Sequence, residues 1–475
     1  MNLDRFFKII KLENSLDSHQ LDVEIPSFEI YPAYLKKNSI YFLWLSGDDA
    51  HQSLALALRK GAYVVTSEII YKNNQNPKII YVKSVRQNLK QLAEYQREHF
   101  NGEVIAITGS VGKSSVKNML SQVLAMKHMT ISTLGNENAW LGIYCTLANI
   151  RSETKYVVLE TGASCPRSLS VPIQVVKPTI SVLLDVNYSH QEKYNSFKEL
   201  LAEKASVIDA LVENGKLFIA FNVAQKLNEQ GYVFRKDISM TTIGDSDHPQ
   251  IDYKILNIDI DKKKAITNIF SETAEQIILS QPDRANAINS VYTWAVLKSL
   301  GMSLHQFNTL IPFYKPLPRR FERLRICNQK EVVFELIDDT YNSSPISVLS
   351  ALQSLEKRQT RRKILVFGDM LELGESTQEL HQAIFDDSTF DQFERIILVG
   401  SVSHLCQTRF KADHFQSIKE AYEVLKDYIL NGDLILLKAS NGMNFYQLRK
   451  LFESEAIHTS SLTQWNIEDE YPESI

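Results

Sequence analysis

The sequence predicts an α/β protein that is divided into three domains. The chain has 475 residues, which is too many for one hydrophobic core and suggests about three domains. From about residue 100 onward, short apolar runs alternate with segments of helical periodicity. This alternation is typical of parallel sheets covered by helices.

Breaks in the periodicity set the predicted domain boundaries. Residues 1–99 contain weak strand signals and one clear helix, which predicts a smaller, mixed α/β N-terminal domain. Residues 100–316 open with the buried run EVIAITGS and predict a central parallel sheet of the P-loop type. Residues 317–475 repeat the pattern with FELIDD, KILVFGD, RIILVG and DLILLKAS, which predicts a Rossmann-like parallel sheet.

Composition excludes several classes of protein. The chain has 44% hydrophobic and 23% charged residues and a net charge of −4, so neither nucleic acid nor an anionic membrane is expected as the main partner. We find no secretory signal and no apolar run of about 18 residues that could span a membrane. The four cysteines stand apart and form no CxxC pair. We therefore expect a cytoplasmic monomer that acts on small molecules.

The sharpest local signal is a phosphate loop between a predicted strand and a predicted helix. Backbone N–H groups at a helix start favour phosphate, and lysine adds a charge for the terminal phosphates, while the serine hydroxyl can bind Mg²⁺. The alternative is a glycine-containing turn with an incidental lysine. The predicted ATP-binding residues here are Thr108, Gly109, Ser110, Val111, Gly112, Lys113, Ser114 and Ser115.

A lysine interrupts the apolar stripe of another predicted helix, which extends from Ser196 to Gly215. Ser196 and Glu199 form a capping-box pair, and apolar residues follow at helical spacing except at Lys204. An ammonium group on that stripe costs free energy unless it is paired or modified. The alternative is a lysine at the stripe's margin whose amino group reaches solvent.

Polar side chains follow several predicted strands at the point where each strand ends. Glu160 closes YVVLE, and His190 follows SVLLDVN. The carboxyl ends of parallel strands meet at one edge of a sheet, so we expect both residues to lie beside the phosphate loop and to hold Mg²⁺ on bound ATP. The alternatives are a surface histidine and an ordinary strand-end glutamate. Asp338-Asp339 and Asp369 also follow strands, where a helix cap or a turn is the other interpretation.

These segments, in this order, resemble the Mur ligases over nearly the whole chain. The loop at Thr108–Ser114 is similar to the family's ATP loop, and Gly135–Asn138 followed by Gly142 is similar to its GNxN segment. Asp339–Pro345 is similar to the DxYNANP motif. The run GDMLELGE at Gly368–Glu375 resembles the signature of the branch that adds D-alanyl-D-alanine.

The resemblance implies a role for each matching residue. Lys113, Lys204 and His190 would be catalytic, and Lys204 matches a lysine that is carbamylated in several members. Mg²⁺ ligands would be Ser114, Glu160, His190 and the Lys204 carbamate. Further ATP contacts would come from Asn286, Asn289, Arg320, Asp339 and Asn342. The substrate residues would be Asn136, Asn138, Asp49 and His51.

The activity implied by the resemblance is ATP-dependent amide formation through an acyl phosphate. The expected reaction adds D-alanyl-D-alanine to UDP-N-acetylmuramoyl-tripeptide in the synthesis of peptidoglycan precursors, and hence serves cell shape and division. The family's DSR triplet is absent, and its KGSR segment reads Lys438–Asn441. One alternative is therefore a divergent ligase that joins an amino acid or dipeptide to another carboxylate. A second alternative is a nucleotide-dependent switch without ligase activity.

Overall fold

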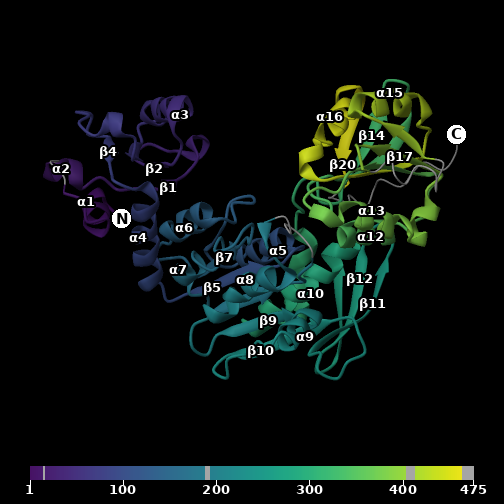
Figure 1. The fold of residues 1–475 in the computed structure, drawn as a ribbon, viewed down its shortest axis with the longest axis horizontal. Helices are drawn as coiled ribbons and strands as arrows, with labels where there is room; N and C mark the ends of the chain where they lie inside the picture. The colour runs from purple at the N-terminus through teal and green to yellow at the C-terminus, as the bar shows by residue number, and fades with distance from the viewer. Residues whose placement is uncertain (14–16, 188–192, 403–411, 463–475) are drawn as a thin grey trace.

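The computed structural model describes the chain except for residues 14–16, 188–192, 403–411 and 463–475. It contains three sheets in chain order, which confirms the predicted α/β class. Figure 1 shows the N-terminal and C-terminal sheets at opposite ends of the long axis, with the central sheet between them. Among the described helices, none is long and apolar enough to cross a membrane.

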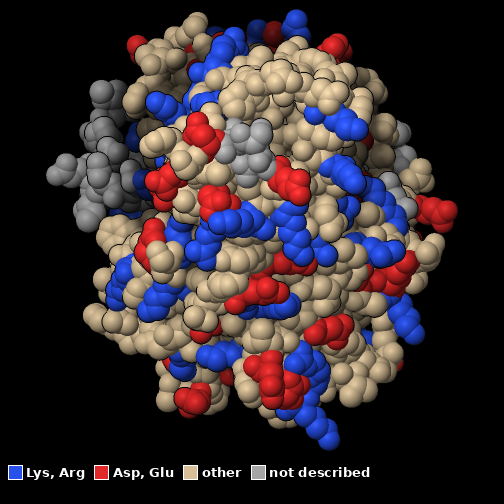
Figure 2. All heavy atoms as spheres, turned by 90° about the vertical axis from the view of Figure 1, so that its left-hand side faces the viewer, with Lys and Arg blue, Asp and Glu red and all other residues tan. Residues whose placement is uncertain are grey.

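The N-terminal sheet is small and entirely parallel, in the order β1-β2-β3-β4. Its strands are β1 (Phe28–Glu29), β2 (Ile40–Leu43), β3 (Tyr63–Thr66) and β4 (Ile79–Tyr81). Its helices are α1 (Leu3–Ile9), α2 (Ser18–Leu21), α3 (Gly47–Arg59) and α4 (Val85–Glu98). Basic and acidic side chains are interspersed on the face that this end of the molecule presents (Figure 2).

The central sheet has nine strands in the order β13-β12-β11-β10-β9-β8-β5-β7-β6. They are β5 (Glu103–Thr108), β6 (Thr130–Ser132), β7 (Tyr156–Glu160), β8 (Ile180–Leu183), β9 (Lys216–Ala220), β10 (Ser239–Gly244), β11 (Tyr253–Ile260), β12 (Ala265–Phe270) and β13 (Ala274–Leu279). The helices are α5 (Lys113–Ala125), α6 (Trp140–Ala148), α7 (Ile173–Val176), α8 (Phe197–Asp209), α9 (Phe221–Glu229), α10 (Arg284–Ser299) and α11 (Leu304–Leu310).

This central sheet is mixed, whereas the sequence predicts a parallel one. The strands from β6 to β11 pair in parallel, but β12 is antiparallel to both β11 and β13. The turns at residues 261–264 and 271–273 are the reason, because a parallel crossover needs a dozen or more residues. The antiparallel strands form the edge of the sheet farthest from β6.

The C-terminal sheet is also mixed, in the order β18-β17-β16-β19-β15-β14-β20. Both β14 and β20 are antiparallel to their neighbours, and the other strands are parallel. The strands are β14 (Glu322–Asn328), β15 (Val333–Asp339), β16 (Lys363–Gly368), β17 (Arg395–Val399), β18 (Asp413–Phe415), β19 (Leu434–Lys438) and β20 (Ala456–Ser461). The helices are α12 (Pro345–Gln353), α13 (Thr377–Phe385), α15 (Ile418–Tyr428) and α16 (Tyr446–Ser454).

One hydrophobic core continues from the N-terminal domain into the central domain, while a smaller cluster beneath α3 belongs to the N-terminal domain alone and the C-terminal domain has cores of its own. Buried side chains continue from Phe6 and Phe28 through Leu92 on α4 to Tyr144 on α6. Two separate clusters cover the two faces of the C-terminal sheet. The chain enters the C-terminal domain past Lys315, whose backbone N–H donates to Gln122 Oε1 at 2.9 Å and whose carbonyl accepts from Gln122 Nε2 at 2.9 Å.

Candidate active site

A cavity of about 800 Å³ lies between the central and C-terminal domains. The phosphate loop and the start of α10 line it from the central domain, and α12 and residues 339–344 line it from the C-terminal domain. Of the predicted site residues, this cavity brings together Ser110, Val111, Gly112, Lys113, Ser114, Ser115, Asn138, Glu160, Asn286, Asn289, Arg320, Asp339 and Asn342. Two domains must therefore meet to complete the site.

The phosphate loop adopts a backbone conformation that requires glycine at Gly112. Gly112 caps α5 with a φ of 87°, a left-handed value that favours glycine, and a Cβ there would lie 2.5 Å from Asn289 Oδ1. Lys113 Nζ donates to the carbonyl oxygens of Gly109 at 2.8 Å and Ser110 at 3.2 Å. Its amino group thus lies within the loop, at the start of α5, where a terminal phosphate would meet the helix dipole.

Lys204 is buried against the same loop. The helix starts where the sequence predicts, because Ser196 caps it, but α8 ends at Asp209 because the chain then turns to pair Val212 N–H with the carbonyl of Pro178. Lys204 is 1% exposed, and its Nζ donates to the Gly109 carbonyl oxygen at 3.0 Å. The alternative of a solvated lysine at the stripe's margin is wrong. Burial lowers the pKa of Lys204 well below its ordinary value, and the nearby Lys113 lowers it further.

Glu160 presents an unused carboxylate oxygen to the cavity. It ends β7 and is 1% exposed, and its Oε1 accepts a hydrogen bond from Asn138 Nδ2 at 3.0 Å. Its Oε2 is buried with no hydrogen-bond partner in the described chain. A buried, unpaired carboxylate oxygen is costly, so Glu160 suits a cation in the cavity. His190, the other predicted carboxyl-edge ligand, lies outside the described residues.

The described part of the chain holds no cluster of three or more histidine, cysteine, aspartate or glutamate side chains that could hold a metal. Of the four predicted Mg²⁺ ligands, His190 lies outside the described residues, and Glu160 is the one carboxylate among the other three. The remaining two are the Ser114 hydroxyl and Lys204, which would bind as a carbamate. The donor set is therefore compatible with Mg²⁺, which prefers oxygen ligands and keeps several waters.

Lys117 is a site residue that sequence reasoning missed. It lies one turn after Lys113 on α5 and is 3% exposed. Its Nζ donates to the carbonyl oxygens of Thr133 at 2.9 Å and Gly135 at 2.6 Å, which joins α5 to the GNEN loop. Burial lowers the pKa of Lys117, and Glu160 opposes this effect. No signal in the sequence distinguishes Lys117 from a surface lysine.

At the start of α10, the cavity wall holds the side-chain amide of Asn286, whose orientation is fixed by Asp283. Asp283 caps α10 and accepts from the backbone N–H of Asn286 at 2.7 Å and from its Nδ2 at 2.9 Å. Asn286 Oδ1 is buried and has no partner in the described chain. Burial raises the pKa of Asp283 to about 7, although both bonds from Asn286 lower it. The sequence analysis predicted Asn286 as an ATP contact but did not predict a role for Asp283.

The C-terminal domain contributes a cation to the phosphate loop. Arg320 Nη2 donates to Ser114 Oγ at 2.9 Å, and the guanidinium carbon lies 3.9 Å from the centroid of the Tyr341 ring. Asp339 Oδ2 pairs with the buried Lys438 Nζ at 2.9 Å, and the same Nζ donates to the Asn342 carbonyl at 2.8 Å. Lys438 therefore fixes the 339–342 loop at the cavity wall.

The predicted substrate residues divide between two places. Asn138 lines the cavity, and Asn136 is exposed in the same loop. Asp49 and His51 are exposed on α3 of the N-terminal domain, where His51 Nδ1 lies 2.8 Å from the Gly47 carbonyl oxygen. They do not line the cavity.

Two stretches of the chain match known protein-family models. Residues 107–297 match the Mur ligase middle domain, and residues 319–441 match the Mur ligase glutamate ligase domain. UDP-N-acetylmuramoyl-tripeptide–D-alanyl-D-alanine ligase of Rickettsia prowazekii is 26% identical over 91% of this chain and 95% of its own length. The protein of that name from Bacillus subtilis is 26% identical over 87% of this chain and 90% of its own length.

Solved structures share the fold. MurF from Acinetobacter baumannii has a TM-score of 0.78 at 21% identity and covers 95% of this chain and 98% of its own. MurF ligase from Thermotoga maritima, solved in complex with ADP, has a TM-score of 0.74 at 22% identity and covers 90% of this chain and 97% of its own. Two family matches, relatives aligned over most of the chain and a fold shared with solved structures lead to one conclusion: the chain belongs to the Mur ligase family.

Proposed function

We propose that this protein uses ATP to join D-alanyl-D-alanine to UDP-N-acetylmuramoyl-tripeptide, with release of ADP and phosphate, in the synthesis of peptidoglycan precursors. The observation that carries the proposal is the phosphate loop at the interdomain cavity, where Lys113 and Lys204 both donate to the Gly109 carbonyl oxygen. Glu160, with one unpaired carboxylate oxygen in the described chain, lines the same cavity. Relatives that align over most of the chain carry the name of this activity. The cytoplasmic location and the monomeric state stay predictions.

The first step transfers the γ-phosphoryl group of ATP to the substrate carboxylate. An oxygen of the carboxylate forms a bond to phosphorus, and the bond from phosphorus to ADP breaks. This step brings several negative charges together, so it needs fixed cations. Lys113 at the loop and Arg320 across the cavity supply two, and both lie where phosphate oxygens would meet the start of α5.

The second step forms the amide. The free amine attacks the acyl carbon, and the resulting tetrahedral centre collapses with loss of phosphate and of the amine proton. Water competes with the amine for the acyl phosphate, so the cavity must exclude it. Residues of the central and C-terminal domains line the cavity from two sides, so a closer approach of the two domains around bound substrates would exclude water.

Ser114 and Glu160, with His190 and a carbamate on Lys204, would hold Mg²⁺, which neutralises phosphate charge. Glu160 fits this role because one of its carboxylate oxygens is buried and unpaired within the described chain. Only a neutral amine reacts with CO₂, and burial of Lys204 favours that form. The carbamate would also replace a buried cation beside Lys113 by an anion.

A phosphate-release assay tests the proposal. Wild-type protein with ATP and Mg²⁺ should release phosphate only when UDP-N-acetylmuramoyl-tripeptide and D-alanyl-D-alanine are both present, and the peptide product should appear in equal amount. Release with a different acid or amine from a panel would instead support a divergent ligase. Release with neither substrate would support a nucleotide-dependent switch.

A further inference from the structure

Arg319 holds a backbone conformation that costs free energy. It opens the C-terminal domain, and its φ of 61° lies in the left-handed region that arginine rarely adopts. The conformation is fixed from both sides, because the Arg319 N–H donates to Glu322 Oε2 at 2.9 Å and its carbonyl accepts from the Tyr341 N–H at 3.0 Å. Such strain concentrates at functional sites.

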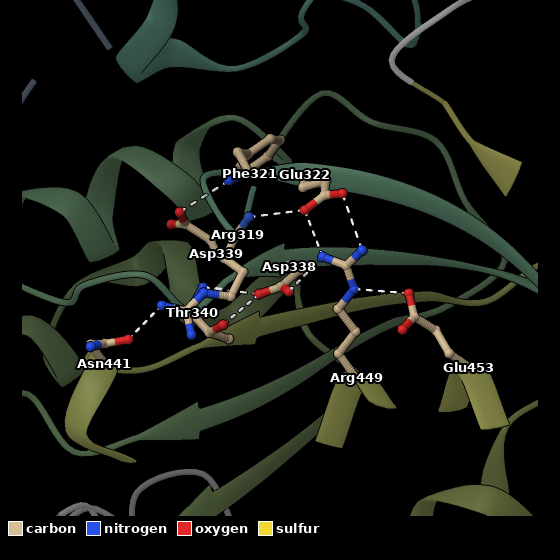
Figure 3. A network of polar contacts seen from close by, with 9 residues as sticks. All are labelled: Arg319, Phe321, Glu322, Asp338, Asp339, Thr340, Asn441, Arg449 and Glu453. Atoms are coloured by element: carbon tan, nitrogen blue, oxygen red, sulfur yellow. Dashed lines mark hydrogen bonds and ion pairs between the residues drawn. The ribbon is translucent and has the colours of Figure 1, made fainter. Parts of the chain in front are cut away.

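The guanidinium of Arg319 is also ordered. It donates to Asn441 Oδ1, and its central carbon lies 5.5 Å from the ring centroid of Tyr341 and 5.9 Å from that of Tyr446. Figure 3 shows Arg319 reaching toward Asn441, away from the neighbouring cluster around Arg449. Two aromatic rings and one amide thus fix the side chain before any ligand arrives.

The carboxylates near Arg319 are already paired with other cations. Asp339 pairs with Lys438 at 2.9 Å. Figure 3 shows that Asp339 also accepts from the Phe321 N–H, at 3.1 Å, and that Glu322 pairs with Arg449, at 2.6 Å. Within the described chain, Arg319 has no ion pair. The side chain is only partly buried, and a guanidinium carries five donors. Most of its donors therefore remain available to an anion.

The position of Arg319 suggests which anion. Tyr341 lines the cavity, and its ring also carries Arg320, which contacts Ser114 in the phosphate loop. Arg319 itself does not line the cavity, but its guanidinium contacts the ring of Tyr341, which does. A dipeptide that lies across this ring, and that spans about 7 Å when extended, would have its amine in the cavity and its carboxylate at Arg319.

We propose that Arg319, supported by Asn441, binds the carboxylate of the incoming dipeptide and so selects a free acid at that end of the amine substrate. The inference rests on the proposed function and names a residue that determines its specificity. Arginine suits the task because its planar fork matches a carboxylate with two parallel hydrogen bonds.

The test compares Arg319→Met with wild type and with Arg361→Met, a matched variant of an exposed arginine that contacts only the Asn431 carbonyl in the described chain. Steady-state phosphate release is measured with D-alanyl-D-alanine and with its C-terminal amide. Arg319→Met should raise the KM for the dipeptide by about tenfold or more, with unchanged KM for ATP and for the UDP-tripeptide. It should no longer distinguish the acid from the amide.

Arg319→Gly separates binding from folding. Glycine adopts the left-handed conformation without steric strain, so this variant should keep the fold, with a melting temperature close to that of wild type, and still show the raised KM for the dipeptide. An unchanged dipeptide KM in both variants, or equal losses for acid and amide, overturns the inference while the proposed function stands. If wild type and Arg361→Met release no phosphate with the dipeptide, the proposed function and the inference both fall.

Discussion

Lys113 and Lys204 donate hydrogen bonds to the same acceptor, the carbonyl oxygen of Gly109, at 2.8 Å and 3.0 Å. One residue comes from α5 and the other from α8, 91 positions later in the chain by their numbers 113 and 204. Burial lowers the pKa of each lysine, and the Lys113 cation lowers the pKa of Lys204 further. The pair is therefore poised to lose one positive charge, and Lys204 is the more deeply buried partner.

Lys204→Met should lose at least about 99% of turnover, which corresponds to about 3 kcal/mol of transition-state stabilisation. The reason is the loss of the proposed carbamate beside the phosphate loop. Phosphate release at saturating ATP and Mg²⁺ measures it, with the exposed Lys198→Met on the same helix as control. A short-chain acid should partly restore Lys204→Ala. Near-normal turnover of Lys204→Met would contradict the carbamate proposal.

Glu160→Gln should raise the Mg²⁺ concentration needed for half-maximal rate by about tenfold or more, because the buried, unpaired Oε2 becomes part of a neutral amide. A titration of rate against Mg²⁺ at fixed ATP measures this. The exposed Glu213→Gln serves as the matched control. Identical Mg²⁺ curves for wild type and Glu160→Gln would remove Glu160 from the metal site.

Asn286→Leu should weaken ATP binding and abolish the preference for ATP over GTP. Asn286 Nδ2 donates to Asp283, which leaves the Asn286 Oδ1 as a free acceptor within the described chain. Adenine carries an amino group at its six-position that can donate to this oxygen, whereas guanine carries a carbonyl there and cannot. Removing the acceptor should cost about tenfold in the KM for ATP. The exposed Asn257→Leu is the control. Retained discrimination in Asn286→Leu would place the base elsewhere.

Asp283→Asn should make the protein more stable at neutral and alkaline pH. Burial raises the pKa of Asp283 from 3.8 to about 7, so the folded chain holds a proton that the unfolded chain releases between about pH 4 and pH 7. Wild-type stability therefore falls across that window as pH rises, by an amount on the order of a few kcal/mol. Asparagine keeps the helix cap without the charge.

Thermal unfolding of wild type and Asp283→Asn at pH 4 and pH 8 measures the effect. The melting temperatures should be similar at pH 4, and the variant should melt higher at pH 8. A difference that does not change with pH would mean that the Asp283 carboxyl titrates normally in the folded protein.

Sequence patterns predicted the features that depend on neighbours along the chain. The phosphate loop and the Ser196 cap are local signals, and Lys204 stood out because it broke a helical stripe. Contacts between segments that are distant in the sequence have no local sequence pattern from which they could be predicted. Arg320 and Ser114 are 206 positions apart, and Lys117 is distinguished only by the loop that covers it. The antiparallel strands β12 and β13 were missed because a parallel sheet was inferred from alternation, without weighing the short turns that exclude crossovers.

One hydrophobic cluster continues from the N-terminal domain into the central domain, whereas the C-terminal domain has clusters of its own. The chain enters the C-terminal domain past Lys315, where Gln122 holds the backbone by hydrogen bonds to its N–H and its carbonyl. Residues of both the central and the C-terminal domain line the cavity. The contact between Gln122 and Lys315 can therefore affect the site although neither residue lines it, because it fixes where one wall of the cavity begins relative to the other.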